Sequence, residues 1–233
     1  MGRLLDEAVD AGTFGLSTGL IYPPGVFSAT DELVALAKRL PDGRVYATHM
    51  RSEGSGLFDS LDEALQIGRQ AACRVQVSHL KVAGRSNWGR AGAALERLDR
   101  ARRDGIPVAQ DVYPYDRSST MLTACLPPWF QEGGDAAILS RLDNQVELAR
   151  ARADMEDPNG GDGHVVRAGY DGILVSSTAS HRFEAQTLAE IAGDLGVGPF
   201  DALAHVLRAE RLRASMVTAL MSEPASKRSW HIR

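Results

Sequence analysis

Two histidines, 30 residues apart in this chain, could share a metal ion. His49 lies near the end of the apolar segment VYATHM, and His79 lies near the end of RVQVSHL, 30 residues further on. Neutral imidazole is the usual nitrogen ligand of Zn²⁺, at about 2.0–2.1 Å. Alternatively, each ring packs locally and donates to a backbone carbonyl, because two histidines do not complete a catalytic zinc site. The spacing alone leaves both interpretations open.

Further polar residues accompany the histidines, because residues two apart in a strand face the same side. They are Arg51 beside His49, Lys81 beside His79, and Tyr113 and Tyr115 beside Asp111. Such a group at one end of a sheet would suit an anionic substrate. The alternative is a set of solvated loop charges.

The elements that position these residues repeat along the chain. Thr18, His49, His79 and Asp111 follow one another at intervals of 31, 30 and 32 residues. Each interval holds one strand, one helix and two loops, which is the length of a βα unit. Four such units predict an α/β fold with a parallel sheet or a (β/α)8 barrel. Both architectures place their chemistry at the carboxyl ends of the strands.

The regular pattern ends near residue 115. Up to that point we expect strands at 14–18, 45–50, 74–80 and 106–113, separated by helices at 30–40, 58–72 and 91–103. Beyond it we expect helices at 134–156, 186–195 and 199–210, and strands at 172–177 and 215–221. The predicted organisation is therefore central βα units at 1–115, an inserted cap at 116–200, a return to the barrel at 201–222 and an unstructured tail at 223–233.

Composition excludes several classes of protein. The 26 Lys and Arg against 30 Asp and Glu give a net charge of −4, which argues against a broad nucleic-acid-binding surface. No run of 18 apolar residues is present, so an ordinary membrane span is not expected, and the first residues form a polar helix pattern rather than a signal peptide. Two cysteines cannot form a disulfide framework, which favours a reducing, cytoplasmic compartment. Cys73 is expected to be a small core residue.

Four phrases, in this order, carry a resemblance to a known family. They are STGLIYPPG at 17–25, YATHMR at 46–51, SHLK at 78–81 and DVYPY at 111–115. Together they resemble the D-aminoacylases, the N-acyl-D-amino-acid deacylases of the amidohydrolase superfamily, over residues 3 to 222. The resemblance favours the shared-metal interpretation of His49 and His79.

The resemblance implies a partial (β/α)8 barrel, about strands four to seven, with His49 and His79 as the Zn²⁺ ligands on the fifth and sixth strands. The implied substrate positions are Tyr22, Lys81, Tyr113 and Ser119, and Arg51 joins them from its place beside His49. Lys81 would attract the carboxylate of the acyl amino acid, and the tyrosines would orient its amide or its carboxylate.

The sequence also departs from the family. The His-X-His of the first barrel strand and the upstream cysteine ligand are absent. The catalytic Asp of the family, in a Gly-Ser-Asp-Gly phrase, should follow residues 221–223, and Asp111 on the seventh strand does not match its position. We therefore expect the central portion of an enzyme, with no catalytic residue of its own, inactive alone and prone to aggregate through open sheet edges.

The implied function is metal-dependent hydrolysis of the amide bond of N-acyl-D-amino acids. The partner is then a small-molecule substrate, with no nucleic acid and no membrane, and the oligomeric state stays open. One alternative is a cyclic-amide hydrolase of the dihydroorotase or hydantoinase type, against which Lys81 and the Tyr22 loop argue mildly. The other is a non-catalytic remnant that binds only a metal or a partner.

Overall fold

The structure is a computed structural model that describes residues 1–158 and 163–222. It divides into two compact units. Unit 1 comprises Met1–Val82 and Asn87–Pro114, and unit 2 comprises Ala83–Ser86 and Tyr115–Ser222. The predicted tail at 223–233 lies outside the described residues.

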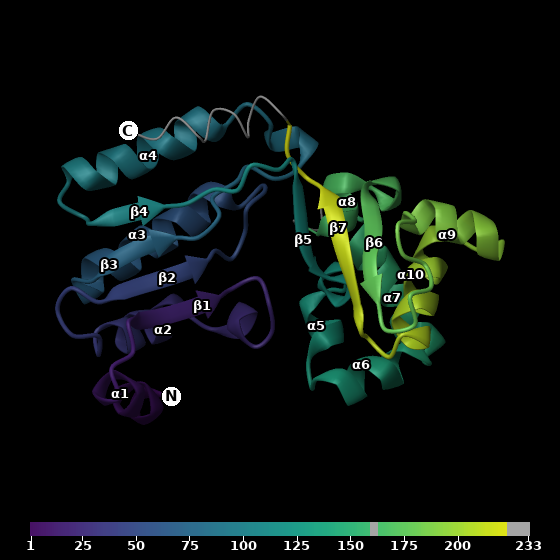
Figure 1. The fold of residues 1–233 in the computed structure, drawn as a ribbon, viewed down its shortest axis with the longest axis horizontal. Coiled ribbons are helices and arrows are strands. Elements are labelled where there is room, and N and C mark those ends of the chain that lie inside the picture. The colour runs from purple at the N-terminus through teal and green to yellow at the C-terminus, as the bar shows by residue number, and fades with distance from the viewer. Residues whose placement is uncertain (159–162, 223–233) are drawn as a thin grey trace. The chain divides into compact units, whose positions relative to one another are not determined.

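Unit 1 is built on a four-stranded parallel sheet (Figure 1). Strands β1 (Gly15–Gly19), β2 (Val45–His49), β3 (Arg74–Val77) and β4 (Val108–Gln110) lie side by side in that order. Helices α2 (Thr30–Ala37), α3 (Leu57–Ala71) and α4 (Ala91–Arg103) connect them, and α1 (Gly2–Asp10) precedes β1. Each helical connection leads from one strand to its next neighbour, always in the same direction across the sheet. Because such crossovers are right-handed, the three connecting helices lie on one face of the sheet. The α/β class and the parallel sheet expected from the repeat are confirmed.

The face of the sheet beneath the helices forms the core of unit 1. Along β2 burial alternates, with Tyr46 and Thr48 buried and the other three residues partly exposed, as expected for a strand packed on one face. Tyr46 is fully buried, and its hydroxyl hydrogen-bonds the Oγ1 of Thr18 at 2.8 Å. His49 is on the opposite face of β2 from Tyr46, because successive side chains point to opposite sides.

Close packing of α3 on β3 depends on a glycine. A Cβ on Gly68 would lie 2.3 Å from Cγ2 of Val75, so a larger residue would push the helix away from the strand. Cys73, in the turn between these two elements, is buried in the same core, as expected for a small apolar residue. Both cysteines are free and buried, and desolvation raises the pKa of the Cys125 thiol, in unit 2, to about 12.

Unit 2 contains a three-stranded antiparallel sheet and several helices (Figure 1). Strands β5 (Arg117–Met121), β6 (Ile173–Thr178) and β7 (Ala214–Ala219) lie in the order β5-β7-β6. The helices are α5 (Pro128–Gln131), α6 (Asp135–Leu142), α7 (Gln145–Glu156), α8 (His164–Ala168), α9 (Leu188–Leu195) and α10 (Pro199–Ala209). Short 3₁₀ helices occur in unit 1 at Gly25–Phe27 and in unit 2 at Leu122–Cys125 and Tyr170–Gly172, and a further one spans Arg85–Asn87.

The second half of the chain differs from expectation in two places. The sequence predicts that 201–222 return to the barrel, but the structure places α10 and β7 in unit 2, where β7 pairs antiparallel with β5 and β6. The sequence also predicts one helical stretch at 134–156. The structure has α6 and α7 there, because the side chain of Asn144 accepts hydrogen bonds from the first N–H groups of α7 and starts a new helix.

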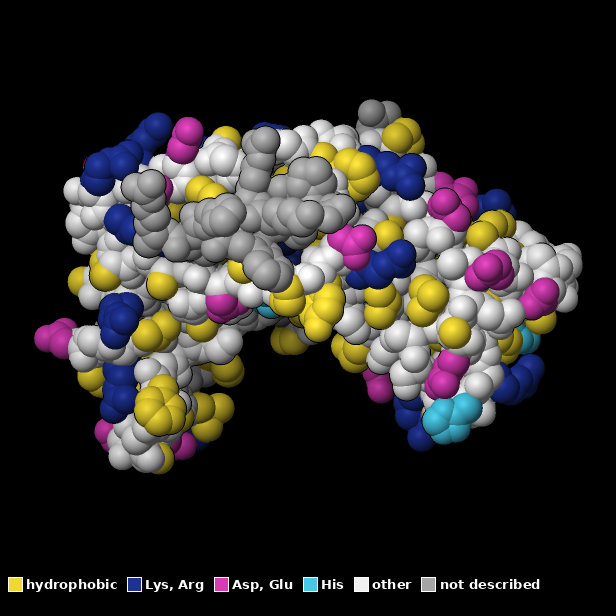
Figure 2. All heavy atoms as spheres, turned by 45° about the horizontal axis from the view of Figure 1, so that its top comes forward, with side chains coloured by type: hydrophobic (Ala, Val, Ile, Leu, Met, Phe, Trp, Pro, Cys, Tyr) yellow, Lys and Arg dark blue, Asp and Glu magenta, His cyan; other side chains and the backbone are white. Residues whose placement is uncertain are grey.

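The surface carries charges of both signs. On the face drawn in Figure 2, Lys and Arg side chains alternate with Asp and Glu rather than forming a single basic area among the described residues. Among those same residues, no helix combines the length and the apolar character needed to cross a membrane.

Candidate metal centre and substrate site

The two predicted ligand histidines come together in unit 1. His49 is the last residue of β2, and His79 follows the end of β3 by two residues. Their ring centroids lie 4.5 Å apart, with an interplanar angle of 74°. Since β2 and β3 are neighbouring parallel strands, their carboxyl ends reach the same edge of the sheet. The convergence expected from the 30-residue spacing is therefore present.

A carboxylate that the sequence did not reveal, Glu53, belongs to this cluster. It lies in the loop between β2 and α3 and is 4 % exposed. The ligand atoms of His49, Glu53 and His79 all lie within 4.8 Å of one another. Two imidazoles and a carboxylate are a donor set found in catalytic zinc sites, so the residues present fit a divalent metal. The sequence signal was only an acidic residue four positions after His49, in a loop to which neither strand nor helix periodicity applies.

Glu53 is held by a buried ion pair. The Nζ of Lys81 lies 2.5 Å from Oε1 of Glu53, and both side chains are 6 % exposed. The Nδ1 of His79 lies 3.1 Å from the same oxygen and 2.8 Å from the Nζ of Lys81. Burial by itself would raise the pKa of Glu53, but the hydrogen bond from His79 and the charges of Lys81 and the two histidines lower it to about 2. The carboxylate is thus ionised at neutral pH.

Asp111 fixes the backbone that carries His79 and Lys81. His79 has a φ of +40°, in the left-handed region that residues other than glycine seldom adopt. Asp111 follows β4 directly, and its Oδ1 accepts the N–H of His79 at 2.5 Å. Its Oδ2 accepts from Nε2 of Gln76 at 2.7 Å, and its carbonyl accepts the N–H of Leu80 at 2.8 Å. Asp111 therefore positions the turn at the end of β3.

Two tyrosines flank the cluster. The ring of Tyr22 lies 5.0 Å from that of His49, measured between centroids. The ring of Tyr113 lies 6.4 Å from that of His79, and the Nζ of Lys81 is 5.3 Å from its centroid. The structure thus brings Tyr22, Lys81 and Tyr113 around the two histidines.

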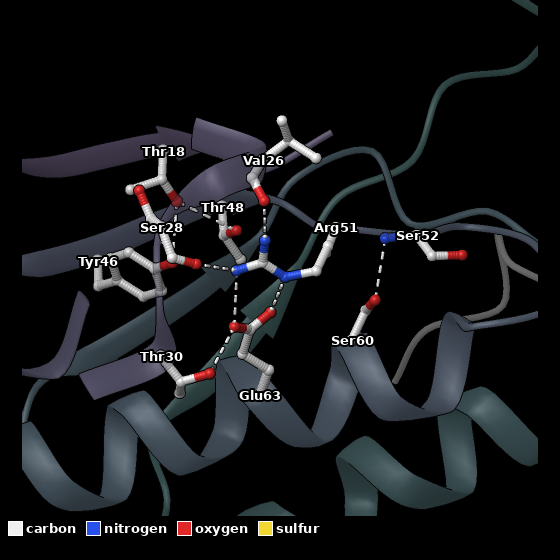
Figure 3. A network of polar contacts seen from close by, with 10 residues as sticks. All are labelled: Thr18, Val26, Ser28, Thr30, Tyr46, Thr48, Arg51, Ser52, Ser60 and Glu63. Atoms are coloured by element: carbon white, nitrogen blue, oxygen red, sulfur yellow. Dashed lines mark hydrogen bonds and ion pairs between the residues drawn. The ribbon is translucent and has the colours of Figure 1, made fainter. Parts of the chain in front are cut away.

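Arg51 makes four hydrogen bonds within unit 1 (Figure 3), and its expected role toward the substrate stays a prediction. Its Nε and Nη2 donate to the two carboxylate oxygens of Glu63 at 3.1 and 2.9 Å. Its Nη1 and Nη2 also donate to the carbonyl oxygens of Val26 and Ser28, each at 2.9 Å. The expected place beside His49 rested on an extended backbone, but β2 ends at His49, and the chain bends at Arg51. Arg51 therefore binds the loop that follows β1.

Ser119, the remaining predicted substrate residue, belongs to unit 2. It lies on β5, opposite Val217 of β7, and is exposed. Unlike Tyr22, Lys81 and Tyr113, it is not among the unit 1 residues that surround the histidines.

Comparison with known proteins gives this cluster a context. No family model matches the chain. It is 42% identical to an N-acyl-D-glutamate deacylase of Alcaligenes xylosoxydans xylosoxydans over 123 residues, which is 52% of this chain and 25% of that protein. An N-acyl-D-aspartate deacylase of the same organism is 44% identical over 124 residues, again 52% of this chain and 25% of the relative. Over about half of its length the chain is thus similar to N-acyl-D-amino-acid deacylases.

Solved deacylase structures resemble the chain over nearly its whole length. The crystal structure of N-acyl-D-glutamate deacylase from Bordetella bronchiseptica, complexed with zinc and a phosphonate inhibitor, matches with a TM-score of 0.72 and 30% identity over 97% of this chain and 39% of that one. A D-aminoacylase structure matches with a TM-score of 0.71 and 27% identity over 98% of this chain and 39% of that one. The chain therefore spans about a quarter of the curated deacylases it matches, and about two fifths of the solved ones.

Proposed function

We propose that this chain supplies the central part of a metal-dependent N-acyl-D-amino-acid deacylase, in which His49 and His79 hold zinc. The observation that carries the proposal is the convergence of the two rings, 4.5 Å apart, at the carboxyl ends of neighbouring parallel strands. Relatives at 41–44% identity are deacylases of this type, and one related structure contains zinc. A bound metal would supply Lewis acidity toward the amide carbonyl and lower the pKa of a water molecule.

The fold of unit 1 supports a partial (β/α)8 barrel, with β1 to β4 as its fourth to seventh strands. The strands follow one another in sequence order, and their connections step in one direction, as in a barrel. In an open doubly wound sheet the order reverses at a switch point. The barrel also accounts for chemistry at the carboxyl strand ends, where His49, His79 and Asp111 lie.

Within this proposal, the chain's own residues bind and orient the substrate. Lys81 places a positive charge next to the histidines, where it would attract the free carboxylate of an N-acyl amino acid. Tyr22 and Tyr113 lie on either side of the histidine pair, where their hydroxyl groups would orient the amide or the carboxylate. Ser119 is proposed as a substrate residue from the resemblance alone.

The test is an assay of the full protein that contains this chain. We expect hydrolysis of N-acetyl-D-amino acids but not of the L-enantiomers, loss of activity with a chelator and recovery with Zn²⁺. His49→Ala and His79→Ala should lose both bound zinc and activity, whereas His181→Ala should keep both, because His181 is an exposed histidine of unit 2. Turnover of hydantoins or dihydroorotate without turnover of acyl-D-amino acids would replace this proposal with the cyclic-amide alternative.

Lys81→Met tests the carboxylate contact. We expect KM for an N-acyl-D-amino acid to rise about tenfold or more with a smaller change in kcat, because a charge-assisted hydrogen bond is worth about 1.5–3 kcal/mol and acts on substrate binding. The control is Lys38→Met, which removes an exposed lysine at the end of α2. Kinetics are compared at equal zinc content. An unchanged KM would exclude this role for Lys81.

A further inference from the structure

We propose that Glu63, a residue of α3, positions Tyr22 for the substrate and that Arg51 transmits this effect. The inference rests on the proposed function and adds to it a residue that is not itself expected to touch the metal or the substrate. Glu63 binds the guanidinium of Arg51, which in turn binds the loop after β1, and this loop carries Tyr22.

The carboxylate of Glu63 connects three segments of unit 1 (Figure 3). Its Oε1 accepts from Nη2 of Arg51 at 2.9 Å and its Oε2 accepts from Nε at 3.1 Å, and such paired bonds fix direction as well as distance. Oε1 also accepts from Oγ1 of Thr30, the first residue of α2, at 2.7 Å. The side chains of Glu63 and Arg51 are 12% and 30% exposed, so water screens the pair less than it would at the surface. Glu63 therefore sets the direction of the guanidinium.

The same guanidinium holds the far side of the loop after β1. Its Nη1 donates to the carbonyl oxygen of Val26 and its Nη2 to that of Ser28, each at 2.9 Å. The N–H of Val26 donates to the carbonyl oxygen of Tyr22 at 2.9 Å. The residue that Arg51 holds is thus bonded directly to Tyr22, and a displaced guanidinium would release the turn between them.

Close packing holds the near side of the loop against the end of β1. A Cβ on Gly25 would lie 2.4 Å from the carbonyl oxygen of Gly19, so the loop returns to contact the strand. A Cβ on Gly19 would lie 3.3 Å from Cδ2 of Tyr22, so the tyrosine ring packs over this glycine, 5.0 Å from the ring of His49 between centroids. With both sides of the loop held, Tyr22 is preorganised beside the histidine, and a preorganised group costs less entropy when it binds a ligand.

A double-mutant cycle in the full protein that contains this chain tests the inference. We expect Glu63→Gln to raise KM for an N-acetyl-D-amino acid about fivefold, the effect of losing one uncharged hydrogen bond, with a smaller change in kcat. In a Tyr22→Phe background the same substitution should raise KM by less than about twofold, because residues that act through one another are not additive. Kinetics are compared at equal zinc content. A rise by the same factor in both backgrounds would overturn the inference, since Glu63 would then act without Tyr22.

Control variants make the comparison specific. Asp62→Asn removes the neighbouring carboxylate of α3, which pairs with Arg97 at the surface, and should leave KM unchanged. Arg51→Lys retains the charge but not the planar fork, so it should raise KM as Glu63→Gln does, and it takes the place of that variant in the cycle if Glu63→Gln does not fold. An unchanged KM would overturn the inference and leave the proposed function intact, whereas a zinc-loaded wild-type protein without deacylase activity would overturn both.

Discussion

Glu53→Gln is expected to lower the free energy of unfolding of unit 1 by about 3–5 kcal/mol, because it leaves the ammonium of Lys81 buried without its carboxylate. Both side chains are 6 % exposed, so water cannot replace the lost partner. The measurement is urea unfolding of the zinc-free chain at neutral pH, followed by circular dichroism.

Two further variants make this expectation specific to the buried pair. Glu53→Gln/Lys81→Met should recover much of the loss, because removing both charges is far less costly than removing one. Asp62→Asn breaks an ion pair with Arg97 whose side chains are 51% and 39% exposed, and exposed pairs contribute about 0–1 kcal/mol. If Glu53→Gln is no more harmful than Asp62→Asn, the pair does not stabilise the unit.

Arg51→Met is expected to lower the free energy of unfolding by about 4 kcal/mol and to loosen the loop that carries Tyr22. The variant removes two contacts with Glu63 and two with loop carbonyl groups, and each such bond contributes about 1 kcal/mol net. Glu63 keeps its hydrogen bond from Thr30, at 2.7 Å, and loses its cation. Hydrogen exchange should accelerate at amides 20–28, which the measurement follows by mass spectrometry.

Two further variants separate the effect of the shape of the Arg51 side chain from the effect of its charge. Arg51→Lys should recover little, because a lysine ammonium cannot reproduce the planar fork that reaches Glu63 and two carbonyl groups together. Arg39→Met is the control, since Arg39 pairs with Asp6 on the surface, with side chains 45% and 43% exposed. Equal stability losses in Arg51→Met and Arg39→Met would contradict a role for Arg51 in fixing the loop.

The sequence predicted those parts of the site that depend on regular elements. His49 and His79 stand at equivalent places in successive βα units, and neighbouring parallel strands bring such places together. Glu53 and Arg51 lie in the irregular segment after β2, where no period relates position in sequence to direction in space. For that reason the buried carboxylate was missed, and the contacts of Arg51 with Glu63 and with the loop after β1 were not expected.

The pairing in unit 2 was beyond prediction for a different reason. Arg117 of β5 pairs with Ala219 of β7, about a hundred residues later. The alternating burial of β7 shows that one face of the strand is packed, and such a pattern is compatible with many partners. Residues 201–222 could therefore be recognised as a helix and a strand, but not assigned to the correct sheet.

In the proposed metal site, the left-handed backbone at His79 limits how the metal preference could change during evolution. With a φ of +40°, position 79 tolerates Asn and Asp far better than β-branched or bulky residues. Both replacements would exchange a nitrogen donor for an oxygen donor, which suits Mg²⁺ or Mn²⁺ better than Zn²⁺. Asp111 binds only the backbone N–H at this position, so it would hold the turn equally well after the exchange. A change of the proposed donor at position 79 would therefore leave intact the turn that presents it.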